Sequence, residues 1–132
     1  MVSDQYAGFS DQEPWIKVNS DYLDWNVQSQ EQDYDSVLNF YRRLSLLRHE
    51  HRSLTEGNWK ELVPNHPHVL AYIRETKEER AFVLLNFSKH AQTVRFKDTV
   101  LPETRSVLSN YDFRKAETTM KLLPYEAHLW FF

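Results

Sequence analysis

The chain has 132 residues, of which 41% are hydrophobic, 14% aromatic and 27% charged, a composition typical of a globular protein with a buried core rather than of a disordered one. A net charge of −3 and the lack of a dense basic cluster disfavour nucleic acid as a partner, and no apolar run approaches the ~20 residues of a membrane span. Zero cysteines exclude disulfides and thiolate metal sites, and with no signal-peptide pattern in MVSDQYAG they predict a cytoplasmic location.

The first segment, QYAGFSDQEPWIKVN (residues 5–19), contains aromatic residues but neither the alternation of a strand nor the 3.6-residue spacing of a helix. Gly8 and Pro14 interrupt it, which predicts an irregular loop. The next stretch, NSDYLDWNVQSQEQDYD (residues 19–35), is polar and acidic, and it predicts further loop with a turn of helix.

An amphipathic helix is predicted from about Tyr34 to His49, with Asp33 as the candidate N-cap. Apolar residues recur at spacings of three and four along one face of this helix. We call this face the apolar stripe, and its members are Val37, Phe40, Tyr41, Leu44 and Leu47.

From Gly57 onward the sequence predicts short strands. Residues 69–75 alternate between apolar and polar positions, residues 81–87 are almost continuously apolar, and the charged turn between them favours a hairpin. Further strand-like pieces follow at 92–96, at 104–110 and in the last fourteen residues, which Pro124 divides. The predicted fold is mainly β with one helix: a loop and helix in residues 1–56, then an antiparallel β-sandwich in residues 57–132.

Histidines and carboxylates offer no convincing catalytic or metal site. The pairs His49/His51 and His66/His68 have the spacing of some zinc ligands, but neither has a third ligand at a useful distance, so we expect no metal or cofactor. The adjacent acids Asp33/Asp35 and Glu78/Glu79 fit helix capping and solubility better than glycoside hydrolysis. The sequence shows no Ser-His-Asp arrangement and no glycine-rich phosphate loop, so no catalytic residue is predicted.

Aromatic residues give the only candidates for ligand contact. Pyranose rings pack well on indole, and two of the four tryptophans, Trp59 and Trp130, lie in the predicted β-domain. Tryptophan at such positions more often serves packing than binding, so these two are weak candidates for contact with an oligosaccharide.

Several segments resemble glycoside hydrolase family 13, and in particular its α-glucosidase branch of oligo-1,6-glucosidases, dextran glucosidases and trehalose-6-phosphate hydrolases. AGFSDQEPWIKVN is similar to the AGF–PWI–VN segment of that family. The similarity continues in the family's order through SVLNFYRRLSLLRHEHRSLTEGNW, HPHVLAYIRE, FVLLNFS, VLSNY and LLPYEAHLW. The segment SVLNFYRRLSLLRHEHRSLTEGNW resembles the last barrel helix and the entry to the C-terminal domain. The four segments after it resemble strands of that domain.

This resemblance implies that residues 1–56 are the end of a catalytic (β/α)₈ barrel and that residues 57–132 are a C-terminal β-domain. The family's retaining mechanism uses an Asp nucleophile, a Glu acid/base and a second Asp, and none of them maps onto this chain. We therefore expect a non-catalytic part of an α-glucosidase whose partner is its own barrel, packed against the loop and the apolar stripe. Two alternatives stay open: a stand-alone carbohydrate-binding domain that uses Trp59 or Trp130, and a protein-interaction domain that forms a homodimer through the apolar stripe.

Overall fold

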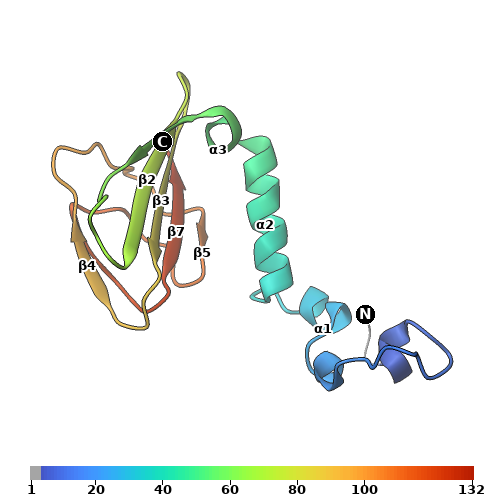
Figure 1. Cartoon of the computed structure of the whole chain (residues 1–132). Helices are drawn as coiled ribbons and strands as arrows, with labels where there is room; N and C mark the ends of the chain where they lie inside the picture. Colours follow the sequence, from blue (N-terminus) through green and yellow to red (C-terminus); the bar gives the residue numbers. More distant parts are fainter. Residues whose placement is uncertain (1–3) are drawn as a thin grey trace. The chain divides into compact units, whose positions relative to one another are not determined.

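The computed structural model describes residues 4–132 and divides the chain into two compact units, Met1–Ser45 and Leu46–Phe132 (Figure 1). The sequence predicts that the barrel part ends and the β-domain begins at residues 56 and 57. The division into compact units at residues 45 and 46 is of a different kind, so that boundary stays a prediction. None of the helices within residues 4–132 has the length and apolar character that crossing a bilayer requires. In chain order the helices are two 3₁₀ turns (Gln5–Gly8 and Ser20–Leu23), α1 (Val27–Gln32), α2 (Val37–Glu50) and α3 (Arg52–Glu56).

The start of α2 lies later than the sequence predicted. Ser36 caps it, since its Oγ accepts a hydrogen bond of 3.2 Å from the amide of Asn39 and its carbonyl accepts one of 2.9 Å from the amide of Phe40. The prediction that Asp33 is the cap is wrong. Asp33 ends α1 in an extended conformation, and its carboxylate accepts from the amide of Asp35, two residues on, which makes a turn rather than a helix start.

The second unit contains seven strands in two antiparallel sheets. Strands β1 (Asn58–Glu61), β2 (Val69–Glu75), β3 (Arg80–Asn86), β5 (Leu108–Ser109) and β7 (Ala127–Phe131) form one sheet in the order β1-β2-β3-β7-β5. Strands β4 (Gln92–Arg95) and β6 (Thr119–Leu122) form the other. The predicted hairpin is confirmed, with Val69 opposite Asn86 and Glu75 opposite Arg80. The mainly-β architecture is also confirmed, and the structure adds the short helices α1 and α3.

Alternation along the strands places one set of apolar side chains in a common core. On β2 and β3 the core positions include Ile73 and its cross-strand partner Phe82, and Phe82 in turn lies opposite Trp130 on β7. The rings of Phe82 and Trp130 stack with centroids 5.0 Å apart. Residues from the two-stranded sheet complete the core: Val94, Phe96, Met120 and Leu122. The second unit thus buries a complete apolar core of its own.

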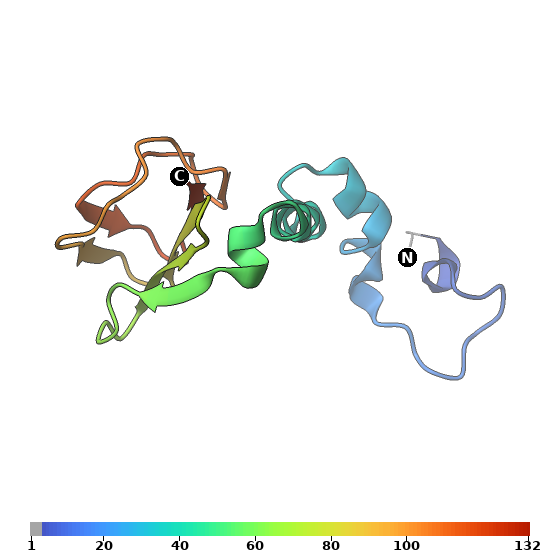
Figure 2. The ribbon, with the colours of Figure 1, turned by 90° about the horizontal axis from the view of Figure 1, so that it is seen from above.

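Helix α3 leads directly into β1 through Gly57 (Figure 2). A Cβ atom on Gly57 would lie 2.4 Å from the carbonyl oxygen of Ser53 and 2.9 Å from the amide nitrogen of Glu75. Only glycine allows this close approach of three backbone segments. The carbonyl of Gly57 also accepts a hydrogen bond of 3.0 Å from the guanidinium of Arg74, which ties the junction to β2.

The first unit has almost no core. Within residues 4–45, Ala7 is the one apolar side chain that is buried. The aromatic and aliphatic residues that the sequence places in this unit are mostly exposed, including members of the apolar stripe. They are Phe9, Trp15, Ile16, Leu23, Trp25, Val27, Tyr34, Val37, Tyr41 and Leu44.

Candidate functional site

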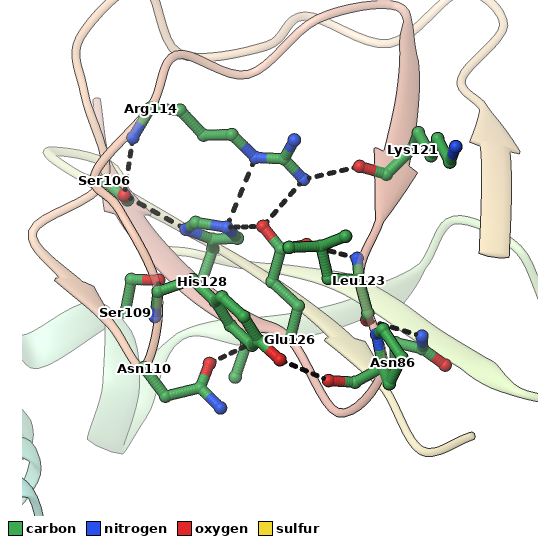
Figure 3. Close-up of polar contacts among 12 residues, drawn as sticks. Asn86, Ser106, Ser109, Asn110, Arg114, Lys121, Leu123, Glu126 and His128 are labelled. Atoms are coloured by element: carbon green, nitrogen blue, oxygen red, sulfur yellow. Dashed lines mark hydrogen bonds and ion pairs between the residues drawn. The ribbon is translucent and has the colours of Figure 1, made fainter. Parts of the chain in front are cut away.

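A buried polar network around His128 is the most chemically suggestive cluster in the second unit (Figure 3). Glu126 precedes β7 and His128 lies within it, whereas Ser106 and Arg114 come from the segments on either side of β5. The Nε2 atom of His128 lies 2.7 Å from Oε1 of Glu126, and its Nδ1 atom lies 3.1 Å from Oγ of Ser106. The guanidinium of Arg114 lies 3.0 Å from the same oxygen of Glu126. The network joins three segments that are distant in sequence.

A neutral imidazole satisfies the contacts of His128 with Glu126 and Ser106, and the 3.3 Å approach of Arg114 Nε to Nε2 is then a close contact rather than a hydrogen bond. Burial lowers the pKa of His128, and it outweighs the hydrogen bond and negative charge of Glu126, which act in the opposite direction. The neutral ring then carries its proton on Nε2 and donates it to Glu126, while Nδ1 accepts from the hydroxyl of Ser106. Arg114 balances the charge of the buried carboxylate.

The order Ser106–His128–Glu126 matches the nucleophile, base and acid of a hydrolytic triad, but the geometry does not support catalysis. All three side chains are buried, so a substrate has no access to the hydroxyl of Ser106. That hydroxyl also accepts a hydrogen bond from the backbone amide of Arg114. We conclude that the network holds the loops on the sheet.

A second polar cluster fastens the start of α3 to the β2–β3 turn. The carboxylate of Glu79 lies 2.5 Å from Nδ1 of His51, and it accepts a hydrogen bond from the buried hydroxyl of Ser53. The ring of His51 stacks on Phe131 with centroids 3.6 Å apart. Partial burial alone would raise the pKa of Glu79, but the hydrogen bonds from Ser53 and His51 and the charge of His51 outweigh it and lower that pKa.

The two tryptophan candidates occupy different environments. Trp130 is completely buried, its ring lies between Phe82 and His128, and its indole nitrogen donates a hydrogen bond to the carbonyl of Arg114. This burial removes Trp130 as a candidate for sugar stacking, because neither face of its ring is free. Trp59 is 56% exposed on the edge strand β1, with the ring of Tyr72 at a centroid distance of 6.1 Å.

One member of each histidine pair makes contacts that serve local structure. His51 belongs to the Glu79 cluster, and the Nδ1 atom of His66 accepts hydrogen bonds from the amides of His68 and Val69. Among residues 4–132, no three His, Asp or Glu side chains come together as a metal site would require.

A shallow pocket lies in the first unit between α1 and the start of α2. Its volume is about 270 Å³, and its lining is a mixture of acidic, polar and apolar side chains. They are Asp24, Trp25, Ser29, Gln30, Asp33, Asp35, Ser36 and Val37. Within the first unit, no element covers this pocket or the exposed apolar residues around it.

Comparison with known families divides the chain at nearly the same place as α3 ends. A profile described as "Alpha amylase, catalytic domain" matches residues 2–57, and one described as "Maltogenic Amylase, C-terminal domain" matches residues 59–129. Together the two matches account for most of the chain.

Individual relatives agree with these matches. The chain is 37% identical over 125 residues to an oligo-1,6-glucosidase of Heyndrickxia coagulans, covering 95% of this chain and 22% of that enzyme. It is 33% identical over 129 residues to a probable oligo-1,6-glucosidase of Bacillus subtilis (strain 168), covering 97% and 23%. The crystal structure of an isomaltulose synthase from Protaminobacter rubrum is similar with a TM-score of 0.88 and 29% identity, over 98% of this chain and 24% of that one. The chain thus spans about a quarter of the length of the proteins it matches.

Proposed function

Because the chain belongs to the α-amylase family, glycoside hydrolase family 13, and corresponds to the end of its catalytic domain followed by its C-terminal domain, we propose that it is a non-catalytic part of an α-glucosidase. Its role is to complete and stabilise the catalytic barrel. The whole enzyme hydrolyses α-glucosidic bonds of small oligosaccharides with retention of configuration. The boundary between the barrel part and the β-domain lies at residues 56 and 57.

The observation that carries this proposal is the contrast between the two units. The second unit buries its own core, whereas the first exposes most of its large apolar side chains. A surface as apolar as this is unstable in water and needs a covering partner. A catalytic barrel attached to the same polypeptide supplies one, with the loop of residues 5–19 and the apolar stripe packed against it.

The proposal assigns no catalytic residue to this chain. The buried network around His128 has no access to substrate, and the family's Asp, Glu and Asp map onto no position here. The relatives differ in activity: two are oligo-1,6-glucosidases, one of them probable, and the third is an isomaltulose synthase. The proposed substrate is therefore the class of α-glucosides rather than one linkage.

The test starts with the native polypeptide that carries this sequence, detected in its source with an antibody raised against the 132-residue chain. A polypeptide several times this length that hydrolyses maltose, isomaltose or trehalose 6-phosphate supports the proposal, provided that the 132-residue chain alone hydrolyses none of them. A native polypeptide of only this length would overturn it and favour an autonomous domain.

Sugar binding by the β-domain is the second candidate function, and the exposed ring of Trp59 beside Tyr72 is the observation that favours it. Quenching of tryptophan fluorescence by millimolar oligosaccharide, lost in Trp59→Phe but retained in Trp15→Phe, would support it. Unchanged fluorescence would count against it.

The homodimer through the apolar stripe and the cytoplasmic location stay predictions. A dimer that depends on concentration and is abolished by Leu44→Asp would support the former.

A further inference from the structure

Exposed aromatic side chains gather at one end of the β-sandwich, where three loops meet. The loops are residues 87–91 after β3, residues 110–113 after β5 and residues 123–126 before β7. Hydrogen bonds connect them: the side chain of Asn86 donates to the carbonyl of Leu123 (Figure 3), and the side chain of Asn110 donates to the carbonyl of Tyr125. The exposed large hydrophobic side chains of these loops are Phe87, Tyr111, Phe113, Leu123 and Tyr125.

Tyr125 occupies an unfavourable backbone conformation that neighbouring segments impose. Its φ is +57°, in the left-handed region where glycine and asparagine are favoured. Its amide donates to the carbonyl of Ser88 at 3.1 Å, and its carbonyl accepts from Nδ2 of Asn110 at 2.9 Å. Glycine would make the same turn with less strain, so the turn itself does not explain the tyrosine. The ring is 59% exposed and contributes nothing to the core.

Tyr111 is fixed beside the same turn. Its hydroxyl donates a hydrogen bond of 2.9 Å to the carbonyl of Pro124, and its amide donates to Oγ of Ser109. The ring is 42% exposed. Both tyrosine rings are thus presented to solvent from a backbone that other elements hold in place.

Hydrogen bonds and ion pairs hold the backbone beneath these rings. Glu126, the residue after Tyr125, is buried and paired with His128 and Arg114. The amide of the next residue, Ala127, donates to Oδ1 of Asn110 at 2.8 Å. A surface whose side chains are held in place before binding loses little conformational entropy when a ligand arrives. Strain of this kind is characteristic of recognition sites.

We propose that Tyr111 and Tyr125 form a binding surface for neutral oligosaccharides of α-linked glucose. The C–H face of a pyranose packs on a tyrosine ring, and tyrosine offers a large amphipathic contact area with few rotatable bonds. The charged neighbours in sequence, Lys89 and Asp112, are exposed and opposite in sign, which suits an uncharged ligand better than a sugar phosphate. The ligand class rests on the proposed function, whereas the aromatic surface does not.

The experiment follows the amide NMR signals of the 132-residue chain during titration with maltotriose and with isomaltotriose. The expected result is shifts confined to residues near Asn110 and Tyr125, with an affinity at least tenfold weaker in Tyr125→Gly and in Tyr111→Ala. Tyr41→Ala, which removes an exposed ring from α2, is the matched control and leaves the affinity unchanged. Trp59→Phe is also expected to leave it unchanged, which separates this surface from the Trp59 edge.

Tyr125→Gly also separates binding from folding, because it relieves the left-handed strain and is expected to leave the melting temperature unchanged or higher. A clear fall in melting temperature, in the chain or in the full-length protein, would assign the ring to packing and overturn the proposal. So would the lack of shifts at millimolar sugar. Hydrolysis of α-glucosides by the full-length protein, measured separately, tests the proposed function and is independent of both results.

Discussion

Glu126 and His128 form a hydrogen-bonded pair of 2.7 Å between two buried side chains on the same face of the chain leading into β7. Arg114 completes the pair from outside, with its guanidinium 3.0 Å from the same carboxylate oxygen. A buried carboxylate is costly unless it is paired and hydrogen-bonded, and these two contacts serve that purpose together with a hydrogen bond from the backbone amide of Leu123. The stability of the second unit therefore depends on this carboxylate more than on any ion pair at its surface.

Replacing the carboxylate tests this dependence. Glu126→Gln keeps the shape of the side chain but leaves Arg114 without its counter-charge, and it is expected to lower the free energy of unfolding by about 3 kcal/mol. The measurement is urea denaturation of the 132-residue chain. Glu75→Gln is the control, because Glu75 pairs with Arg80 at 2.7 Å on the surface of the same unit, and its loss is expected to cost less than about 1 kcal/mol. Equal effects of the two substitutions would contradict the prediction.

Acid is expected to destabilise the second unit in two steps. The folded state holds the pKa of His128 below its ordinary value of 6.5, so as the pH falls through 6.5 the unfolded chain takes up a proton that the folded chain does not. The free energy of unfolding is therefore highest above pH 6.5 and decreases below it. The lowered pKa of Glu79 stabilises the folded state above pH 4.5, where 4.5 is the ordinary pKa of this carboxyl group. This stabilisation is lost as the pH falls through the pKa of Glu79 in the folded state.

Urea denaturation at a series of pH values measures these steps. His128→Gln retains a donor for Glu126 but has no titrating ring, and it is expected to flatten the dependence just below pH 6.5 while leaving the more acidic step in place. A profile in His128→Gln that matches the unmodified chain would show that His128 is not the group responsible.

The junction between α3 and β1 is predicted to reject any side chain at Gly57. Gly57→Ala places a methyl group against the backbone of Ser53 and Glu75, neither of which can move without disturbing α3 or β2. The expected loss of stability is about 2–3 kcal/mol. Asn58→Ala, at the exposed neighbouring position, is expected to change it by less than about 0.5 kcal/mol. Thermal unfolding followed by circular dichroism distinguishes the two.

The sequence predicted the parts of the fold that depend on local pattern. The alternation in residues 69–75 and the apolar run in 81–87 were enough to identify the β2–β3 hairpin. The cap of α2 was misassigned because Asp33 and Ser36 are both good cap residues, and the turn between α1 and α2 decides between them. Local pattern cannot resolve such a choice.

The polar network could not be predicted in the same way. The network consists of Ser106, Arg114, Glu126 and His128. The pairing of β5 with β7 and the backbone bridge between Arg105 and Lys115 bring these segments together. One signal was available: Glu126 and His128 are polar residues at alternate positions beside an apolar strand, which indicates a satisfied buried group. The burial of Trp130 likewise follows from its place opposite Phe82, which composition alone does not reveal.

The apolar stripe on α2 gives a prediction that depends on the proposed barrel. Val37 and Tyr41 are 79% and 67% exposed, so Tyr41→Asp is expected to change the unfolding of the 132-residue chain by less than about 0.5 kcal/mol. In the full-length protein the same aspartate would be buried against an apolar partner, with an expected loss of several kcal/mol and of most glucosidase activity. Glu50→Gln, a change outside the stripe, is the control in both backgrounds. If Tyr41→Asp is harmless in the full-length protein as well, the stripe does not face the barrel, and a second copy of the chain becomes the better partner.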